Sequence, residues 1–331
     1  APEARTNSPE YNNDAEALQL ATGMERKIEW SRLARVGGPI GLDHLDRLVG
    51  GKCVLYPMPG CRVGESRDFE LLDFAITCLH DFDASTGINI ITGQDLGHGI
   101  MSDDVTSSLK YLHAHFVGSV LADTSLPTAA GNFYALSGAL KAFQLDLSRC
   151  LIGLLGCGNI GTHILERLEE LGTQVVVVEA RPEKRQELEA SGIQVWGPEK
   201  KQEFLGLPLD AIVINANGGS LDTESVRTIA RNDNIKVVCG CENLIMPHRE
   251  DEQIFIKARK LYCPTEYCGM MGYLTAVEEY LCQLEGKDFD IHALCEAAEK
   301  IEKNAQLSSE LVLAQDFGLS FSQAVRTVCL S

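Results

Sequence analysis

The sequence Leu-Ile-Gly-Leu-Leu-Gly-Cys-Gly-Asn-Ile-Gly occupies residues 151–161 and sets the main structural expectation for the chain. Its first five residues form an apolar run of strand length, and three glycines follow at fixed positions. Gly156 permits a tight turn, Gly158 lets a ligand approach the backbone, and Gly161 lets a helix pack closely against the strand. The pattern predicts a strand, a phosphate-binding turn and a helix in immediate succession.

The residues that follow continue this alternation. Strands are expected at 174–179, 211–215 and 236–239, and helices at 160–171, 183–191 and 223–230. Such alternation specifies a parallel sheet covered on both faces, so the fold class is α/β with a Rossmann dinucleotide-binding domain. Glu179 ends the second strand, where an acid binds the adenosine ribose and disfavours a 2′-phosphate. NAD is therefore expected, and Arg181, Lys184 and Arg185 leave NADP as the less favoured cofactor.

The residues before this unit are expected to form an α/β substrate domain. Apolar residues recur every three or four positions at 16–28 and 69–81, which predicts two amphipathic helices. Apolar segments at 53–56 and 87–92 have the length of strands. A long helix at 128–143 leads into the first strand of the dinucleotide-binding unit, and the domain boundary is placed on it.

The chain is accordingly divided into three parts. Residues 1–143 form the substrate domain, residues 144–272 the Rossmann domain, and residues 273–331 a set of helices that returns to the first domain. Since 331 residues exceed what one core usually supports, we expect two domains with the active site in the cleft between them.

The composition argues against several classes of protein. With 47 acidic and 29 basic side chains, the formal charge of -18 repels nucleic acid and anionic membranes. The apolar runs are too short to span a bilayer and the N-terminal residues lack an apolar signal core, so a cytoplasmic location is expected. The twelve cysteines include no CxxC pair, which argues against a metal site and favours reduced thiols in the core.

Several segments resemble, in the same order, the family of amino-acid dehydrogenases that includes leucine, phenylalanine, valine and glutamate dehydrogenases. Residues 20–27 (LATGMERK) resemble the family's helix with a substrate-binding lysine, and residues 50–52 (GGK) its loop with the catalytic lysine. Residues 93–97 (GQDLG) are similar to the segment of the catalytic aspartate. Residues 127–131 (PTAAG) are similar to the segment whose threonine meets the nicotinamide amide. The likeness extends over most of the chain.

The resemblance implies roles for these residues. Lys52 and Asp95 are the catalytic pair, in which Lys52 is the base for water attack on an iminium and Asp95 exchanges protons with the amine. Lys27 anchors the substrate carboxylate, with Met24, Gly51 and Gly269 as further substrate-binding positions. The glycine motif and the resemblance together place the cofactor at Gly156, Gly158, Asn159, Ile160, Gly161, Glu179, Ala180, Arg181, Thr128, Ala216, Asn217, Gly218, Glu242 and Asn243.

Three features depart from the family. Gly269 stands where the family has an asparagine that holds the substrate. The stretch between Lys27 and Lys52 is longer than in the family, and the additional residues are expected over the substrate pocket. Residues 1–6 resemble a segment that family members reach only after an N-terminal helix and strands, which leaves open both a fragment and a different subunit arrangement.

The resemblance predicts NAD-dependent oxidative deamination of an α-amino acid to the 2-oxo acid, or reductive amination in reverse. It also implies a homo-oligomer of at least two subunits and a substrate with a medium-sized or aromatic side chain. Two alternatives stay open: an oxidoreductase of the same fold that acts on another imine or ketone in a biosynthetic pathway, and a non-catalytic NAD-binding regulatory subunit. Taken alone, a lysine beside glycines is usually a solvated loop residue, so the order of the motifs carries the interpretation.

Overall fold

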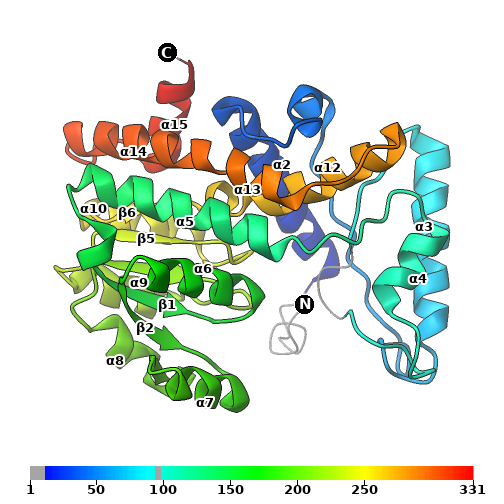
Figure 1. Cartoon of the computed structure of the whole chain (residues 1–331), viewed down its shortest axis with the longest axis horizontal. Coiled ribbons are helices and arrows are strands. Elements are labelled where there is room, and N and C mark those ends of the chain that lie inside the picture. The colour runs from blue at the N-terminus through cyan, green and yellow to red at the C-terminus, as the bar shows by residue number, and fades with distance from the viewer. Residues whose placement is uncertain (1–11, 94–97, 331) are drawn as a thin grey trace.

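The computed structural model describes residues 12–93 and 98–330. It contains a six-stranded parallel sheet with the strand order β3-β2-β1-β4-β5-β6, on the left in Figure 1. The strands are β1 Leu151–Leu155, β2 Gln174–Val178, β3 Gln194–Trp196, β4 Ala211–Ile214, β5 Val237–Gly240 and β6 Leu261–Tyr262. The strand order reverses between β1 and β4, where such a sheet opens a crevice at the carboxyl ends of its strands. The predicted α/β fold with a dinucleotide-binding type of sheet is confirmed.

The two faces of the sheet are buried by different helices. The helices of this unit are α5 Ser125–Ala142, α6 Asn159–Glu170, α7 Pro182–Ala190, α8 Lys201–Leu205, α9 Thr223–Arg231 and α10 Glu252–Lys257. Side chains alternate along a strand, so Ile152 and Leu154 of β1 pack with residues of α5 and α6. Leu155 packs on the opposite face with residues of α8, α9 and α10. The continuous apolar runs of the sequence thus reflect strands that are buried on both faces.

The described residues before α5 contain four helical elements, and α3 and α4 lie apart from the sheet (Figure 1). These are α2 Asn13–Ala34, a 3₁₀ helix at Gly41–Arg47, α3 Asp68–Thr86 and α4 Ser108–His115. The helix predicted at 16–28 is found as α2 but extends further, because Trp30 and Ser31 are buried on it. It ends at Arg35, whose φ of 51° takes the chain out of the helix.

Two strands predicted in this region are absent from its described residues. Residues 53–56 pair with no strand, and three of their four side chains are exposed. Residues 87–92 make a single parallel bridge, between Thr92 and Ser119. The prediction of strands at 53–56 and 87–92 was wrong, since an apolar run shows the length of a strand but not whether a neighbouring segment can pair with it. As far as the structure describes it, this region is helical and extended rather than α/β.

The C-terminal part is helical, as predicted for residues 273–331. Its helices are α11 Thr265–Cys268, α12 Met270–Glu285, α13 Ile291–Ala297, α14 Glu299–Ala314 and α15 Phe321–Leu330. α13 and α14 are separated only by Ala298. α14 packs along α5, α15 packs against α14 and α2, and α12 contacts both α5 and α2. The last helices therefore connect the sheet unit with the N-terminal helix.

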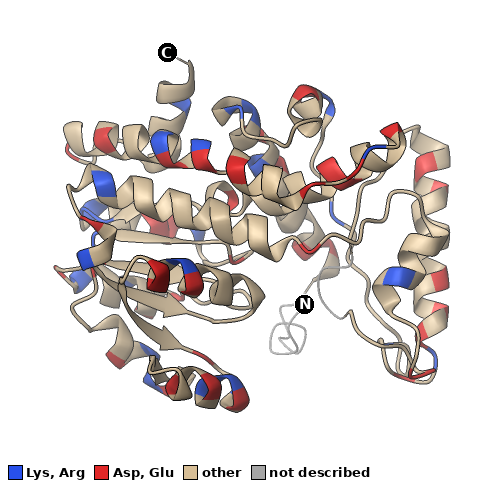
Figure 2. Ribbon diagram, viewed as in Figure 1, with Lys and Arg blue, Asp and Glu red and all other residues tan. Residues whose placement is uncertain are grey.

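Charged side chains lie on helices and loops, and the six strands carry none (Figure 2). α3 carries five acidic side chains and no Lys or Arg, so this helix is strongly negative. None of the described helices is both long and apolar enough to cross a membrane. All twelve cysteines fall within the described residues, where seven are buried and none forms a disulfide.

Candidate functional site

The turn from β1 into α6 borders the crevice between β1 and β4. Gly156 has a φ of +90°, and a Cβ atom there would lie 2.8 Å from the carbonyl oxygen of Asn215, which follows β4. A Cβ atom at Gly161 would lie 2.3 Å from the carbonyl oxygen of Gly156. Gly156 is needed for its backbone conformation, and both positions are too crowded for a side chain. The strand, turn and helix predicted at residues 151–161 are present.

The N-terminus of α6 faces open space. A Cβ atom at Gly158 would meet no atom within 4 Å, and Gly158 offers no side chain to cap the helix. The first backbone N–H groups of a helix have no acceptor within the helix, and in α6 these include the N–H groups of Asn159 and Ile160. The helix dipole also favours an anion at this end. The turn therefore fits the diphosphate of a dinucleotide.

Glu179 lies directly after β2, next to the glycine turn. One carboxylate oxygen accepts from Cys157 N at 3.0 Å, and the other accepts from the Arg181 backbone N at 2.9 Å. The Arg181 guanidinium also donates to both oxygens, at 3.1 and 3.3 Å. Burial opposes ionisation of Glu179, but the side-chain and backbone hydrogen bonds from Arg181 and Cys157 outweigh it and hold its pKa below the ordinary value. Arg181 uses much of the hydrogen-bonding capacity of the Glu179 carboxylate. The Arg181 side chain must therefore move if a ribose is to bind to Glu179.

Glu242 connects the loops that follow β4 and β5. Its carboxylate accepts from Ala216 N at 3.1 Å, from Ser220 N at 2.9 Å and from the Ser220 hydroxyl at 2.7 Å. Burial raises the pKa of Glu242, while the hydrogen bonds from Ser220, Ala216 and Gly218 act in the opposite direction. Asn217 is the exposed tip of the loop. The predicted positions Ala216, Gly218 and Glu242 thus form one connected unit beside the crevice, to which Ser220 belongs although its sequence position gave no sign of this.

A second polar cluster at the crevice was missed by the motif analysis. The side-chain oxygen of Asn215 accepts from Asn132 Nδ2 at 2.9 Å, from Cys241 N at 3.2 Å and from the Cys241 thiol at 2.9 Å. Burial raises the pKa of Cys241 to about 12, so its thiol is protonated and able to donate. The cluster joins α5, β4 and β5 at the carboxyl edge of the sheet.

Lys27 reaches this edge from the N-terminal helix. Its Nζ atom on α2 donates to Asn243 Oδ1 at 3.2 Å, in the loop after β5. Its charge also lies close enough to Cys241 to influence that thiol. The predicted carboxylate anchor Lys27 and the predicted cofactor-binding residue Asn243 are therefore in contact.

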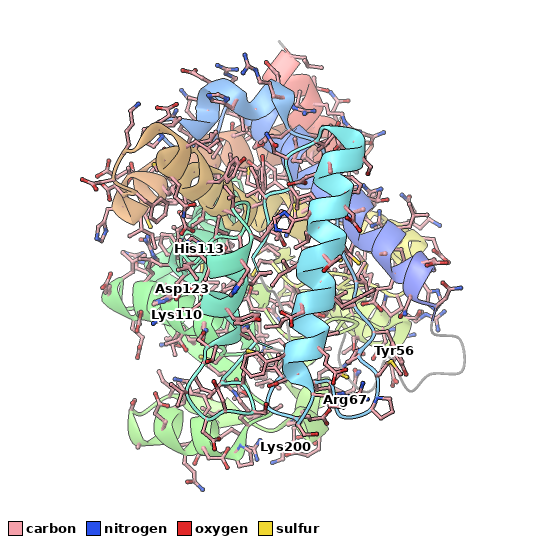
Figure 3. The ribbon with its side chains drawn as sticks, turned by 90° about the vertical axis from the view of Figure 1, so that its right-hand side faces the viewer. Tyr56, Arg67, Lys110, His113, Asp123 and Lys200 are labelled. Carbon is pink, nitrogen blue, oxygen red and sulfur yellow. The ribbon has the colours of Figure 1, made fainter. Side chains whose placement is uncertain are left out.

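Lys52 lies on a segment that passes against α2. Gly50 N donates to Glu25 Oε2 at 2.5 Å, and a Cβ atom at Gly50 would lie 2.4 Å from Glu25 N. The loop therefore contacts the same turn of α2 that carries Lys27. Lys52 is partly buried, whereas Gly51 is exposed and has open space where a side chain would be. Further along this segment Tyr56 is exposed (Figure 3).

Gly269 is enclosed by its neighbours. A Cβ atom there would lie 2.9 Å from Thr265 O and 3.1 Å from Cys241 Cβ, so the position cannot hold an asparagine without rearrangement. Among the other predicted positions, Thr128 is buried and its hydroxyl donates to Thr124 O at 2.6 Å. Met24 is partly buried against the core.

Asp95, the predicted partner of Lys52, lies outside the described residues. The additional stretch between Lys27 and Lys52 packs on α12, where Glu278 accepts from Ile40 N at 2.9 Å and from Gly41 N at 2.6 Å. Its position relative to a substrate stays a prediction.

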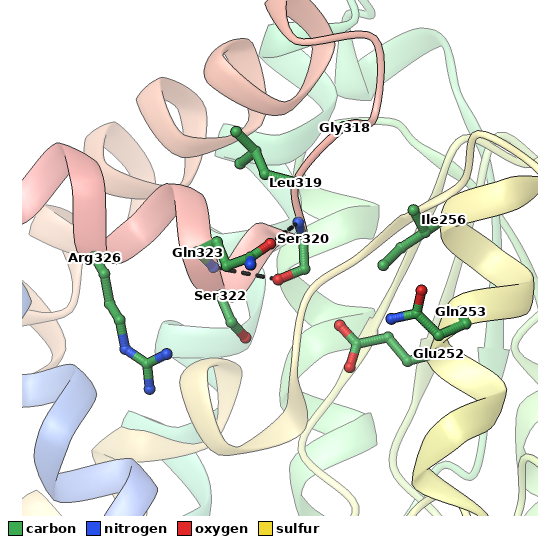
Figure 4. Close-up of a pocket in the computed structure, with 9 residues that line it drawn as sticks. All are labelled: Glu252, Gln253, Ile256, Gly318, Leu319, Ser320, Ser322, Gln323 and Arg326. Atoms are coloured by element: carbon green, nitrogen blue, oxygen red, sulfur yellow. Dashed lines mark hydrogen bonds between the residues drawn. The ribbon is translucent and has the colours of Figure 1, made fainter.

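A depression of about 390 Å³ lies between α10 and α15 (Figure 4). Its lining includes Glu252 and Gln253 of α10 and Ser322, Gln323 and Arg326 of α15, and none of the predicted site residues. The guanidinium of Arg326 is already paired with a carboxylate of α2. The depression is separate from the set of residues at the sheet edge.

The sequence of the chain is similar to one protein-domain family and to several characterised enzymes. The model of the TrkA-N domain matches residues 152–197. The valine dehydrogenase of Streptomyces virginiae is 27% identical over 281 residues, which cover 83% of this chain and 70% of the relative. That of Streptomyces albus is 26% identical over 285 residues, which cover 85% and 71%.

Solved structures share the fold. The L-tryptophan dehydrogenase of Nostoc punctiforme superposes with a TM-score of 0.67 at 21% identity, covering 98% of this chain and 85% of that one. The glutamate dehydrogenase of Plasmodium falciparum has a TM-score of 0.66 at 16% identity, covering 97% and 73%. At such low sequence identities, these similarities show a shared fold only.

Proposed function

Because the chain belongs to the family of glutamate, leucine, phenylalanine and valine dehydrogenases, we propose that it is an NAD-dependent amino-acid dehydrogenase. It converts an α-amino acid to the 2-oxo acid and ammonia, or runs in reverse. The observation that carries the proposal is the contact between Lys27 and Asn243, because it brings an amine from α2 to the edge of the crevice. A carboxylate bound there lies beside the predicted cofactor loops.

The proposed chemistry assigns one task to each side chain. A bound nicotinamide cofactor supplies the hydride acceptor. Lys27 binds the substrate carboxylate, and Asp95 takes a proton from the substrate ammonium so that the nitrogen lone pair can form an iminium. Lys52 then removes a proton from the water that attacks the iminium carbon. Asp95 returns its proton to the nitrogen, which leaves as ammonia while the carbonyl forms and the proton of the hydroxyl group passes to water.

NAD rather than NADP is proposed as the cofactor. The lowered pKa of Glu179 keeps this side chain anionic at neutral pH, and an anion after β2 repels a 2′-phosphate. Arg181 beside it is more than half exposed and supplies the opposite charge. The preference for NAD over NADP therefore depends on the balance between the negative charge of Glu179 and the positive charge of Arg181.

The substrate is proposed to be an amino acid with an apolar side chain. The names of the curated relatives support this, since they are valine dehydrogenases. The test is to incubate the purified chain with NAD and each of a panel of amino acids, and to follow NADH by its absorbance. We expect branched or aromatic amino acids to give NADH, and ammonia to be required in the reverse direction.

A second candidate is an oxidoreductase of this fold that acts on another imine or ketone. The enclosed position of Gly269 favours it, since a substrate-holding asparagine does not fit there. The two candidates are separated by supplying NADH and a 2-oxo acid with either ammonia or a primary amine. Turnover with the primary amine but not with ammonia favours the second candidate. NAD binding without turnover of any of these compounds, and without an effect of Lys52→Ala, would instead point to a regulatory subunit.

We also propose that residues 1–143, 144–272 and 273–331 act as substrate domain, cofactor domain and returning helices, with the active site in the cleft. A homo-oligomer of at least two subunits is proposed from the family resemblance. Light scattering after size-exclusion chromatography tests this, and a mass of one chain contradicts it.

A further inference from the structure

We propose that Asn132 and Asn215 bind the carboxamide group of the nicotinamide ring, with Asn215 as donor and Asn132 as acceptor. The inference rests on the proposed use of a nicotinamide dinucleotide. It adds two residues to the cofactor site that neither the glycine motif nor the family resemblance included.

The orientation of the Asn215 amide is fixed by its neighbours. Its oxygen accepts from Asn132 Nδ2, from Cys241 N and from the Cys241 thiol. Reversing the amide would place its NH2 group against the backbone N–H of Cys241 and the NH2 of Asn132, which are donors only. The amide nitrogen of Asn215 is therefore the side-chain atom that these hydrogen bonds leave unused.

Two buried polar atoms of this cluster have no hydrogen-bond partner within the described residues. These are Asn215 Nδ2 and Asn132 Oδ1. Buried polar groups of folded proteins are almost always paired, and leaving them unpaired is unfavourable. One of the two atoms is a donor and the other an acceptor. A primary carboxamide offers the complement, because its oxygen accepts and its NH2 donates.

The two residues lie where the nicotinamide end of the cofactor is expected. Asn215 follows β4, and its carbonyl oxygen borders Gly156 across the crevice. Asn132 lies four positions after Thr128 on α5, so the two share one face of the helix. Thr128 is the position that the family resemblance assigns to the nicotinamide amide. The unpaired atoms and the predicted amide position thus belong to the same side of α5.

The test combines protein variants with cofactor analogues and measures binding by calorimetry. The ligands are NAD, its 3-acetylpyridine analogue, in which a methyl group replaces the amide NH2, and ADP-ribose, which lacks the nicotinamide. We expect the wild-type protein to bind the acetylpyridine analogue about tenfold more weakly than NAD, the size of one hydrogen bond. In Asn132→Val, which removes the acceptor and also the Nδ2 donor to Asn215, this difference should fall below about twofold.

A second variant tests the donor. Asn215→Asp keeps the oxygen that Cys241 and Asn132 bind and replaces the unpaired NH2 by an oxygen. We expect it to weaken NAD about tenfold or more while leaving ADP-ribose unchanged. The matched control is Asn304→Val, since Asn304 also belongs to a partly buried hydrogen-bond cluster but lies on α14. It should leave the discrimination between the ligands as in the wild type.

The proposal is overturned if wild type and Asn132→Val discriminate equally between NAD and the analogue, which would assign the unpaired atoms to an ordered water. It is also overturned if Asn215→Asp weakens ADP-ribose as much as NAD, which would indicate a purely structural role. The measurements use no amino acid, so failure to oxidise amino acids leaves their outcome unaffected.

Discussion

The carboxyl edge of the sheet and the region before α5 position their polar groups in different ways. At the sheet edge, Glu179 bonds to a residue 22 positions away and Glu242 to one 26 positions away, each across neighbouring strand ends. Lys27 instead contacts Asn243 across 216 positions, and within residues 12–93 and 98–330 no strand pairs with the segment that carries Lys52. The proposed cofactor side is therefore built by secondary structure, while the proposed substrate side depends on a few tertiary contacts. Variants of the first should weaken cofactor binding, and those at crowded positions should also lower stability, whereas variants of the second should change substrate binding or turnover with little effect on stability.

The largest effect is expected for Lys52→Ala. Loss of a positioned base should lower kcat by about a thousandfold, because general base catalysis contributes roughly that much. NAD binding and the thermal midpoint should stay near the wild-type values, since Lys52 is on a segment outside the sheet. Steady-state kinetics and calorimetry measure both. The matched control is Lys110→Ala, an exposed lysine on α4 (Figure 3), and a loss in kcat of less than about tenfold for Lys52→Ala would contradict a catalytic role.

A set of glycine variants compares crowding with open space at the sheet edge. Gly156→Ala meets both a φ of +90° and an oxygen 2.8 Å away, so it should lose about 2 kcal/mol of stability and most NAD affinity. Gly158→Ala meets nothing within 4 Å and should fold normally, yet bind NAD about tenfold or more weakly. Gly172→Ala, with a φ of +74° and open surroundings, is the control for backbone strain and should leave NAD binding intact. Normal NAD binding by Gly158→Ala would place the diphosphate elsewhere.

Lys27→Met tests the long-range contact on the substrate side. Removing a charged hydrogen-bond donor to a carboxylate should raise KM about 10- to 100-fold and change kcat less. Arg26→Met is the control, because the neighbouring Arg26 faces Glu266 at 3.6 Å instead. If both variants raise KM equally, the carboxylate is not held by Lys27.

Glu179→Ser addresses the balance of charge after β2. Removing the anion while Arg181 remains should shift the ratio of kcat/KM toward NADP by about tenfold, the effect of a partly exposed charge pair. The kinetics with both cofactors measure it, and Glu183→Ser on α7 provides an exposed acidic control. An unchanged ratio would remove Glu179 from the cofactor site.

The smallest effect concerns pH. The pKa of Glu179 lies below its ordinary value of 4.5 in the folded chain, because the hydrogen bonds from Arg181 and Cys157 outweigh the effect of burial. A lowered carboxyl pKa stabilises the fold above pH 4.5, and this contribution is lost as the pH falls through the folded-state pKa. Glu179→Gln should therefore melt a few degrees lower at neutral pH and lose less stability than the wild type on acidification. If the melting temperatures of the two proteins fall by the same amount as the pH is lowered, the prediction is contradicted.

The sheet unit could be predicted because its signals are local. Residues 151–161 contain strand, turn and helix in one stretch, and the acid at Glu179 ends the next strand at the expected distance. Apolar runs buried on both faces leave little ambiguity about a parallel sheet. The same kind of signal failed at 53–56 and 87–92, since pairing depends on a neighbouring segment that the run itself does not contain.

The candidate site was predictable only in part. The order of motifs led to the prediction of Lys27, Lys52 and the cofactor loops as site residues, but no pattern indicated that Lys27 would contact Asn243 or that Gly269 would be enclosed by Cys241. The cluster of Asn132, Asn215 and Cys241 joins a helix to the ends of two strands.

A sequence written in one dimension carries the periodicity of strands and helices and the positions where only glycine fits, since both arise from neighbouring residues. Which donors and acceptors face each other, and which are left unpaired, follows from contacts between residues far apart in the chain. Those contacts exist only after the helices have packed on the sheet, because that packing brings their side chains within hydrogen-bond distance.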